Sequence, residues 1–439
     1  MNGRFTVKAW LGGLGLALLL AFVVLLAVPV ALDLWGPAAP ATAPAVETGA
    51  ARADRSGDLQ VARGAYLARA GHCAGCHTAP GGAPYAGGRG IDTPFGTVYA
   101  SNLTPDATSG LGRWSADDFW QALHHGRSRD GRLLAPAFPY PNYTEVQRED
   151  ADALFAYLRS LPPVAQRNRA QALRFPYGTP LALAVWRRLY FRPGVYQPDA
   201  AQSAAWNRGA YLVRGLGHCA ACHSPRNTLG APSMADALAG GLLPMQRWYA
   251  PSLLAPDEAG VQRWPLEDVV DLLQSGVSAQ GGVLGPMAEV VWGSTQHLTE
   301  ADLRAMAIYL RGLPEQPPAA RPARKPDETQ LAAQLRSGGE LYGNHCASCH
   351  GKQGEGAPGA YPALAGNRTV LMQPPLNAVR AVLLGGYPPA TAGNPRPYGM
   401  PPLGQVLNDR EIAAVLTYTR QAWGNQAAPV SAVDVQQAR

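Results

Sequence analysis

The chain has 439 residues, a formal net charge of +6 and 47% hydrophobic residues. At this length more than one domain is expected, and the 49 glycines and 40 prolines indicate many turns and connectors. The basic residues do not cluster between aromatic residues, so the composition argues against a nucleic-acid-binding protein. A mildly positive chain is compatible with an acidic protein partner.

The amino-terminal residues 1–35 predict a membrane anchor. Residues 9–32 are 24 residues without a charge, which is long enough to span a bilayer as a helix. Arg4 and Lys8 precede this segment, which predicts a cytoplasmic amino end. The sequence thus predicts a single-pass protein of the bacterial inner membrane whose remaining chain lies in the periplasm.

An Ala/Pro-rich segment, residues 36–57, follows and is expected to be an extended tether. Small residues at 41–43 offer an alternative, in which the apolar segment is a leader that is cleaved at this point. Pro44 is a poor residue directly after a cleavage site, and the apolar segment is long for a leader. We therefore favour the uncleaved anchor.

Three related segments organise the rest of the chain. RGAYLARAGHCAGCH (63–77) returns as RGAYLVRGLGHCAACH (208–223) and, more loosely, as GGELYGNHCASCH (338–350). Repetition of this kind predicts three similar domains. The predicted organisation is a domain over 58–165, an apolar connector over 166–204, a domain over 205–315, a linker over 316–329, a domain over 330–425 and a tail over 426–439.

Each domain is expected to be helical, because the long segments between its helices are rich in Gly and Pro and lack strand-like alternation. A short helix is predicted over 114–126 in the first domain and over 264–276 in the second. Each domain is expected to close with an apolar helix, over 153–163, 305–315 and 414–424. The predicted fold class is all-α, with an amino-terminal transmembrane helix followed by three domains.

Each repeat contains the motif Cys-x-x-Cys-His, and these motifs hold all six cysteines: Cys73, Cys76, Cys219, Cys222, Cys346 and Cys349. A redox dithiol has no use for the histidine, and a zinc site would need a further ligand from elsewhere. Covalent haem attachment uses all three side chains, because the thiols add to the haem vinyl groups and the histidine ligates the iron. Three copies with no cysteine left over predict three covalently bound c-type haems.

The iron ligands on the motif side are predicted to be His77, His223 and His350. A ligating histidine usually donates its other N–H to a carbonyl, which fixes the plane of the imidazole ring. Pro80 and Pro225, just after the first two motifs, are the expected acceptors.

A thioether sulfur is the expected sixth ligand of an electron-carrying haem iron. Met287 and Met400 lie in Gly/Pro-rich loops ahead of the predicted closing helices, and we predict that they ligate iron. The remaining methionines after the first residue are interpreted as core residues: Met234, Met245, Met306 and Met372.

With these features, residues 58–425 resemble the membrane-bound three-haem cytochrome c subunits of periplasmic dehydrogenases. The similarity includes PFGTVYASNLTPD in the first repeat, GPMAEVVWGSTQHLTEADLRAMAIYL in the second and MPPLGQVLNDREIAAVLTYTR in the third. The resemblance implies class I cytochrome c-like domains and a catalytic partner that is a quinoprotein, a flavoprotein or a molybdoprotein. It also implies that the chain passes electrons from that subunit to ubiquinone or a terminal oxidase and is not itself the catalyst.

The first repeat departs from the pattern, because no methionine lies between residues 2 and 233. Phe138 occupies the slot that methionine fills in the other two repeats. The first haem is therefore expected to be five-coordinate or, as the alternative, to bind His124 or His125. A methionine borrowed from a neighbouring domain would need a longer reach. An open haem near distal histidines would also suit an enzyme, so a peroxidase-like multihaem enzyme is the alternative function.

Overall fold

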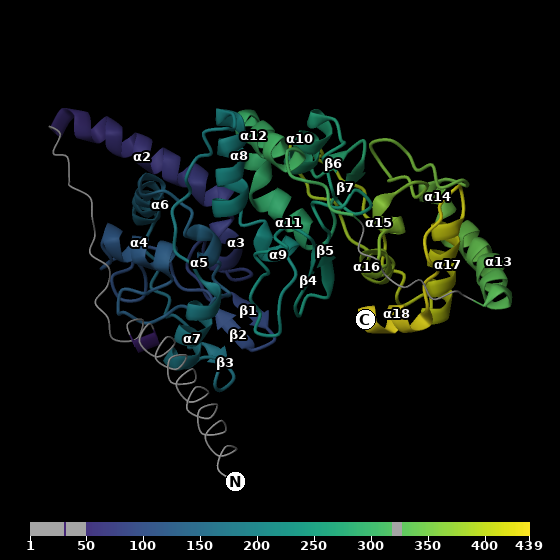
Figure 1. Cartoon of the computed structure of the whole chain (residues 1–439), viewed down its shortest axis with the longest axis horizontal. Helices are drawn as coiled ribbons and strands as arrows, with labels where there is room; N and C mark the ends of the chain where they lie inside the picture. Colours follow the sequence, from purple (N-terminus) through teal and green to yellow (C-terminus); the bar gives the residue numbers. More distant parts are fainter. Residues whose placement is uncertain (1–29, 32–49, 318–326) are drawn as a thin grey trace, which may run out of the picture. The chain divides into compact units, whose positions relative to one another are not determined.

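The computed structural model describes residues 30–31, 50–317 and 327–439 (Figure 1). The chain divides into two compact units. The first contains the chain up to Gly64 together with Ala79–Val195, and the second contains Ala65–Thr78 together with Tyr196–Arg439. The first Cys-x-x-Cys-His motif thus belongs to the same unit as the second and third motifs.

The predicted membrane anchor needs correction. Among residues 30–31, 50–317 and 327–439, no helix is both long and apolar enough to cross a membrane. The longest of these helices, α2 (Ala50–Ala70) and α13 (Glu328–His345), carry charged residues along their length, whereas a span needs about 20 predominantly apolar residues. The anchor expected over 9–32 lies outside the described residues, apart from 30–31, and the prediction of a single-pass membrane protein is not supported.

The prediction of an all-α fold is also wrong, because the described chain contains three small antiparallel sheets. In the first unit β1 (Gly90–Thr93), β2 (Gly96–Tyr99) and β3 (Ala172–Leu173) form one sheet. The second unit contains two hairpins: β4 (Gly241–Leu243) with β5 (Trp248–Ala250), and β6 (Val277–Ser278) with β7 (Gly281–Gly282). Strands of two to four residues are too short to show an alternating pattern, so periodicity could not reveal them.

The helices of the first unit include those expected from the first repeat. The predicted helix over 114–126 is α4 (Ala116–His125), which a capping box at Ser115 begins and a left-handed Gly126 ends. The helices that follow in this unit are α5 (Tyr140–Tyr143), α6 (Arg148–Ser160) and α7 (Pro180–Tyr190).

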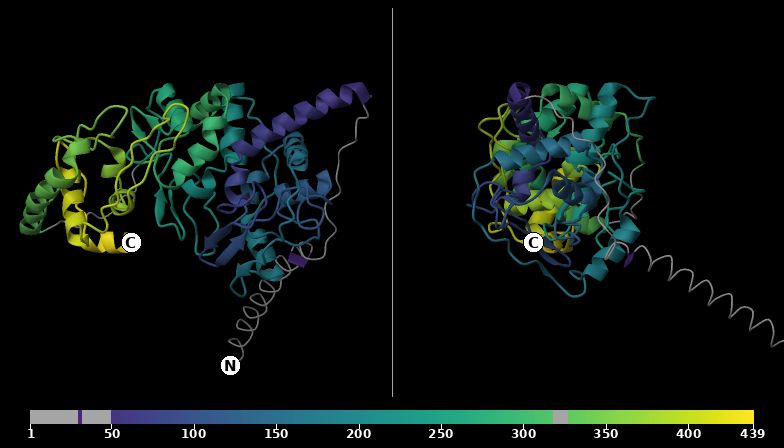
Figure 2. Two further views of the ribbon diagram at one scale, coloured as in Figure 1. Left: turned by 180° about the vertical axis from the view of Figure 1, so that it is seen from behind. Right: turned by 90° about the vertical axis from the view of Figure 1, so that its left-hand side faces the viewer.

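The second unit contains the helices of the second and third repeats. Its elements, in chain order, are α3 (Cys73–His77), α8 (Ala204–Tyr211), the π-helix η1 (Leu212–Leu216), α9 (Ala220–His223), α10 (Leu266–Ser275), α11 (Pro286–Gly293), η2 (Thr295–His297), α12 (Glu300–Arg311), α13, α14 (Ala347–His350), α15 (Arg368–Leu371), α16 (Leu376–Leu384), α17 (Asp409–Gln421) and α18 (Ala432–Ala438). Helix α18 lies in the segment expected as a tail and packs with α16 and α17 through the buried Val435 and Ala438 (Figure 2).

In each repeat the helix before the motif crosses the closing helix at a glycine. A Cβ atom built on Gly64 or Gly209 would lie 1.9 Å from the carbonyl oxygen of Ala153 or Ala305, respectively. On Gly338 it would lie 2.2 Å from the carbonyl oxygen of Ala414. Only glycine permits this approach between two helix backbones, so the three repeats share one helix crossing.

The distance along the chain from this glycine to the first cysteine differs between the repeats. It is nine residues in the first repeat, ten in the second and eight in the third. The additional residue of the second repeat coincides with η1, in which the helix widens to i→i+5 hydrogen bonding. The π-helix therefore absorbs an insertion between the crossing and the motif.

The crossing generates a prediction for α13. Gly338→Ala is expected to lower the free energy of unfolding by about 1–3 kcal/mol, because the added carbon would collide with the backbone of α17. Gly343→Ala in the same helix is the control, since no atom lies within 4 Å of its added carbon. The control is expected to be neutral or stabilising by up to about 1 kcal/mol. Chemical unfolding followed by circular dichroism compares the two, and equal destabilisation would contradict this account.

Candidate haem-binding sites

Each Cys-x-x-Cys-His motif forms a short helical turn that follows the helix with the crossing glycine, with η1 between the two in the second repeat. These turns are α3, α9 and α14. All six cysteines lie in the described residues and none forms a disulfide. Cys76 and Cys222 are exposed, and the other four are half-buried. In every motif, therefore, at least part of the thiol pair is accessible to a group that reacts with sulfur.

The residue before the first cysteine shows how two of the turns are built. His72 and His218 adopt left-handed backbone conformations, with φ angles of 50° and 37°. In the third motif, by contrast, His345 is the last residue of α13. A left-handed residue reverses the chain direction at the end of a helix. The first two motifs are thus presented in one way and the third in another.

The thiols do not have the electrostatics of a redox dithiol. Burial, reinforced by the neighbouring cysteine, raises the pKa of Cys73 and of Cys219 to about 12. The same two causes raise the pKa of Cys346 to about 11. A redox-active pair instead works through a thiolate whose pKa is lowered. These environments favour neutral thiols, which covalent attachment converts into uncharged thioethers.

Two of the motif histidines are oriented by a backbone carbonyl. The Nδ1 atom of His223 lies 2.7 Å from the carbonyl oxygen of Pro251, and Nδ1 of His350 lies 2.9 Å from that of Pro362. A carbonyl can only accept, so Nδ1 carries the proton and Nε2 is left with its lone pair for a metal. The expected acceptor Pro225 was wrong, since the loop that returns to His223 comes from 28 residues along the chain.

Burial also favours the ligand form of His223. It lowers the pKa of this histidine, although the bond to Pro251 acts in the opposite direction. Neutral imidazole is the form that binds iron. The thiols and histidines of the motifs therefore fit a covalently attached haem. The acceptor expected for His77, Pro80, stays a prediction.

The two methionines predicted as iron ligands lie in different local structures, and only Met400 lies in a loop as expected. Met287 is in the first turn of α11, directly after Pro286, and partly packs on the core of the second repeat. Met400 pairs its backbone with Gly386 in an isolated bridge and partly packs on the core of the third repeat. Neither side chain is fully buried, and the role of both methionines as iron ligands stays a prediction.

The other methionines divide into two groups. Met306 and Met372 are buried, as predicted for core residues. Met234 and Met245 are 76% and 61% exposed, so the interpretation of these two as core residues was wrong. Both lie in a bend or a turn outside the helices and strands, where periodicity gives no information on burial.

The candidate distal residues of the first repeat, His124, His125 and Phe138, all lie in the first unit. His124 is buried, stacks on Trp120 at a centroid distance of 4.3 Å and meets the edge of His125. Burial, with the neighbouring His125, lowers the pKa of His124 to about 4. Phe138 packs on Tyr143, with ring centroids 5.4 Å apart. His124 is thus a neutral, stacked imidazole, and His125 is the less buried of the two.

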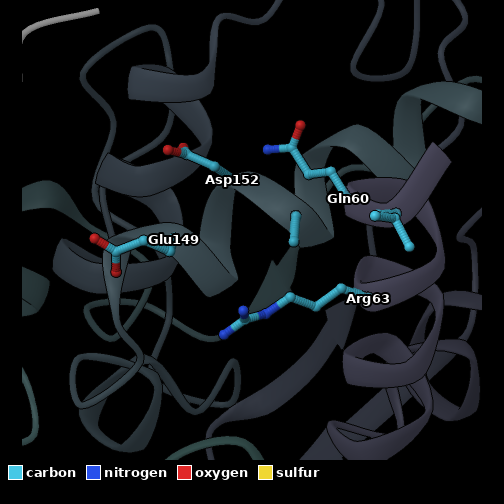
Figure 3. A pocket seen from close by; sticks show the side chains of 6 residues that line it. Gln60, Arg63, Glu149 and Asp152 are labelled. Carbon is cyan, nitrogen blue, oxygen red and sulfur yellow. The ribbon is translucent and has the colours of Figure 1, made fainter. Parts of the chain in front are cut away.

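A shallow pocket between α2 and α6 contains no predicted site residue (Figure 3). It is lined by Leu59, Gln60, Arg63, Glu149, Asp152 and Ala153. Arg63 is engaged there, because its Nε atom donates to Asp150 at 2.6 Å. The pocket is therefore a surface feature around an ion pair that joins the two helices.

Comparison with known proteins supports the haem interpretation. The cytochrome c family model matches residues 61–162 and 335–423. The chain is 38% identical to the cytochrome c subunit of alcohol dehydrogenase (quinone) from Gluconobacter oxydans, over 92% of this chain and 87% of that protein.

Two further relatives extend the comparison. The gluconate 2-dehydrogenase cytochrome c subunit of Pantoea cypripedii is 38% identical over 87% of this chain and 90% of its own length. A nicotinate dehydrogenase subunit from Pseudomonas putida is 42% identical over 82% of this chain but only 30% of that protein. The three relatives differ in the dehydrogenase that their names give.

Proposed function

This chain belongs to the family of cytochrome c subunits of dehydrogenase complexes, and we propose that it carries electrons from a catalytic dehydrogenase subunit to ubiquinone or a terminal oxidase. The chain itself is not the catalytic subunit. Its relatives serve dehydrogenases named for alcohol, gluconate and nicotinate, so a quinoprotein, a flavoprotein or a molybdoprotein is the proposed class of partner. Co-purification of the natively expressed chain with such a subunit tests this proposal.

We propose three haems, one in each of the domains 58–165, 205–315 and 330–425. The cysteine pairs of the three motifs would form the thioether bonds, and His77, His223 and His350 would bind the irons. The observation that carries this proposal is the Nδ1-to-carbonyl bond of two motif histidines, which leaves Nε2 available. Haem, when bound, supplies a one-electron iron couple.

The side chains and backbone of the protein position the haems and tune their reduction potentials. The motif turns fix the point of attachment, and the carbonyls of Pro251 and Pro362 fix two imidazole planes. Met287 and Met400 would supply thioether sulfur, which raises the reduction potential of haem iron. The protein thereby sets spacing and potential, as expected of an electron carrier.

Haem attachment is tested by counting. The denatured protein should retain three haems per chain in the pyridine haemochrome assay, because thioether bonds survive unfolding. Replacing both cysteines of one motif, for example Cys346→Ser with Cys349→Ser, should lower the count to two. A count that does not change would refute covalent attachment at that motif.

The methionine ligands are tested by substitution. Met400→Ala should remove one sulfur-to-iron charge-transfer band and lower the reduction potential of one haem. Met306→Leu is the matched control, because Met306 is buried in the core and a change to leucine nearly conserves its volume. The control should keep the spectrum and all three potentials. Retention of every charge-transfer band in Met400→Ala would contradict the assignment.

For the first haem we propose a site without methionine ligation. The absence of methionine from residues 2–233 and the presence of Phe138 support a five-coordinate iron, with His125 or His124 as the alternative ligand. His124 is buried and stacked on Trp120, so it is the less accessible of these two alternative ligands.

This proposal predicts that carbon monoxide binds one haem of the reduced protein. Carbon monoxide difference spectra and low-temperature spin resonance measure the open fraction. His125→Ala and His124→Ala should both leave that fraction unchanged for a five-coordinate haem, whereas the variant that lacks the ligating histidine should increase it for a bis-histidine haem. Three low-spin haems that do not react with carbon monoxide, each with methionine ligation, would overturn the proposal.

A further inference from the structure

The first haem-binding motif packs against the second repeat within one compact unit. Residues Ala65–Thr78 cluster with Tyr196–Arg439, and the end of α2 lies beside α8 and α12 (Figures 1 and 2). The buried Ser294 hydroxyl donates to the carbonyl of Ala70 at 3.0 Å. A Cβ atom on Gly293 would lie 2.2 Å from the His72 ring, so a larger residue there would force this ring to move. The imidazole of His218, directly before Cys219, hydrogen-bonds the backbone of Gly71, and a Cβ atom on Gly71 would lie 3.5 Å from the Leu216 side chain. The first and second motifs are therefore in contact.

A polar cluster fastens this contact. The Tyr66 hydroxyl donates to Asp302 at 2.6 Å and accepts from the backbone N–H of Thr299 at 3.2 Å. Arg208 donates to both oxygens of the same carboxylate, at 2.8 and 2.7 Å. Tyr66 lies seven residues before Cys73, and Arg208 lies eleven residues before Cys219. One carboxylate thus links the helices that lead into two motifs.

The carboxylate is held in its ionised form. Burial alone would raise the pKa of Asp302, but hydrogen bonds from Arg208 and Tyr66 outweigh it and keep this pKa below its ordinary value. Tyr66 stays a neutral donor, because burial and the Asp302 carboxylate raise its pKa. Charge-assisted hydrogen bonds of this kind are stronger and more directional than neutral ones.

The other repeats show that this cluster does more than stabilise a helix crossing. In the first repeat the equivalent pair is Arg63 with Asp150, the two joined inside their own repeat. In the third repeat Ser337 stands where the others have arginine, directly before the crossing glycine. The third crossing forms without such a pair, so the pair is not required for it. The tyrosine that reaches Asp302 belongs to a different repeat from the carboxylate.

We propose that Tyr66, Asp302 and Gly293 are positioning residues that hold the first haem-binding motif against the second, so that the two haems form an electronically coupled pair. This inference rests on the proposed function, because it requires haem on both motifs. Each haem would be attached beside its own cysteine pair. Motifs in contact would therefore hold the two haems near each other.

If both motifs carry haem, the pair would exchange single electrons directly. A ferrous iron in one haem would become ferric as the ferric iron of the other became ferrous, and no proton or further reactant would be needed. Because electron exchange weakens steeply with distance, a change that loosens the motif contact should slow it. Loss of the Tyr66 hydroxyl removes a hydrogen bond to a charged group, which corresponds to roughly a tenfold weaker docking equilibrium.

The experiment uses the full chain with its haems. Two coupled haems give a bisignate circular dichroism signal in the Soret region. The difference between the intact protein and the variant Cys73→Ser with Cys76→Ser isolates the contribution that requires the first haem. We expect a bisignate difference for the intact protein and loss of most of it in Tyr66→Phe and in Gly293→Ala. Flash reduction should show correspondingly slower electron exchange between the two haems.

Asp150→Asn is the matched control, since it removes the equivalent carboxylate from the first repeat but leaves the contact between motifs. It should keep the bisignate signal, and Tyr66→Phe, Gly293→Ala and Asp150→Asn should each retain three haems per chain. Loss of the signal in this control as well, or its retention in both Tyr66→Phe and Gly293→Ala, would overturn the positioning role. An intact protein with three haems and no bisignate difference would overturn the coupled pair while leaving the proposed function in place. A lower haem count in the intact protein would instead contradict the proposed function.

Discussion

The close crossing of two helices at a glycine is the constraint on which each repeat depends. Gly64, Gly209 and Gly338 each lie against a backbone carbonyl of the closing helix, where a side chain would collide. A contact between two helix backbones leaves little freedom in the distance or angle between the helices, because no side chain lies at the contact that could adjust by changing its rotamer. The crossing therefore fixes where the helix before the motif ends. The first cysteine of each motif follows the crossing glycine by eight to ten residues, so the crossing also determines where the motif lies.

The variation between repeats is taken up after the crossing. The second repeat accommodates its additional residue in η1, and the third continues α13 straight into the motif. His72 and His218 accept left-handed conformations, which for histidine carry a cost. Such a cost is tolerated where surrounding contacts over-determine the backbone. Here the contact of His72 with Gly293 is one of those constraints.

Local features of the fold could be predicted from the sequence, and features made by distant residues could not. The helices around 114–126 and 264–276 follow from an apolar face and end signals, and the structure contains them as α4 and α10. The acceptor of the His223 imidazole was missed, because Pro251 comes from a loop 28 residues away and no periodic pattern marks it. The bond between Tyr66 and Asp302, 236 residues apart, was missed for the same reason. The β-hairpins are fixed by pairing between short strands rather than by either strand alone.

The second repeat carries contacts to both of the others within its unit. Its α12 binds the segment before the first motif through Asp302. Its strand β5 is joined to α16 of the third repeat, where Asn377 exchanges two hydrogen bonds with the backbone of Tyr249. Gly276, at the end of α10, lies so close to Pro389 that an added Cβ would be 2.4 Å from its ring. The Asn377 amide bonds to the edge of β5 as a neighbouring strand would. Together with the close Gly276 contact, it restricts movement of the third repeat relative to the second. If each motif carries haem as proposed, the haem of the second repeat would lie in a domain that contacts both other repeats. Substitutions in the second repeat should then affect two electron-transfer steps rather than one.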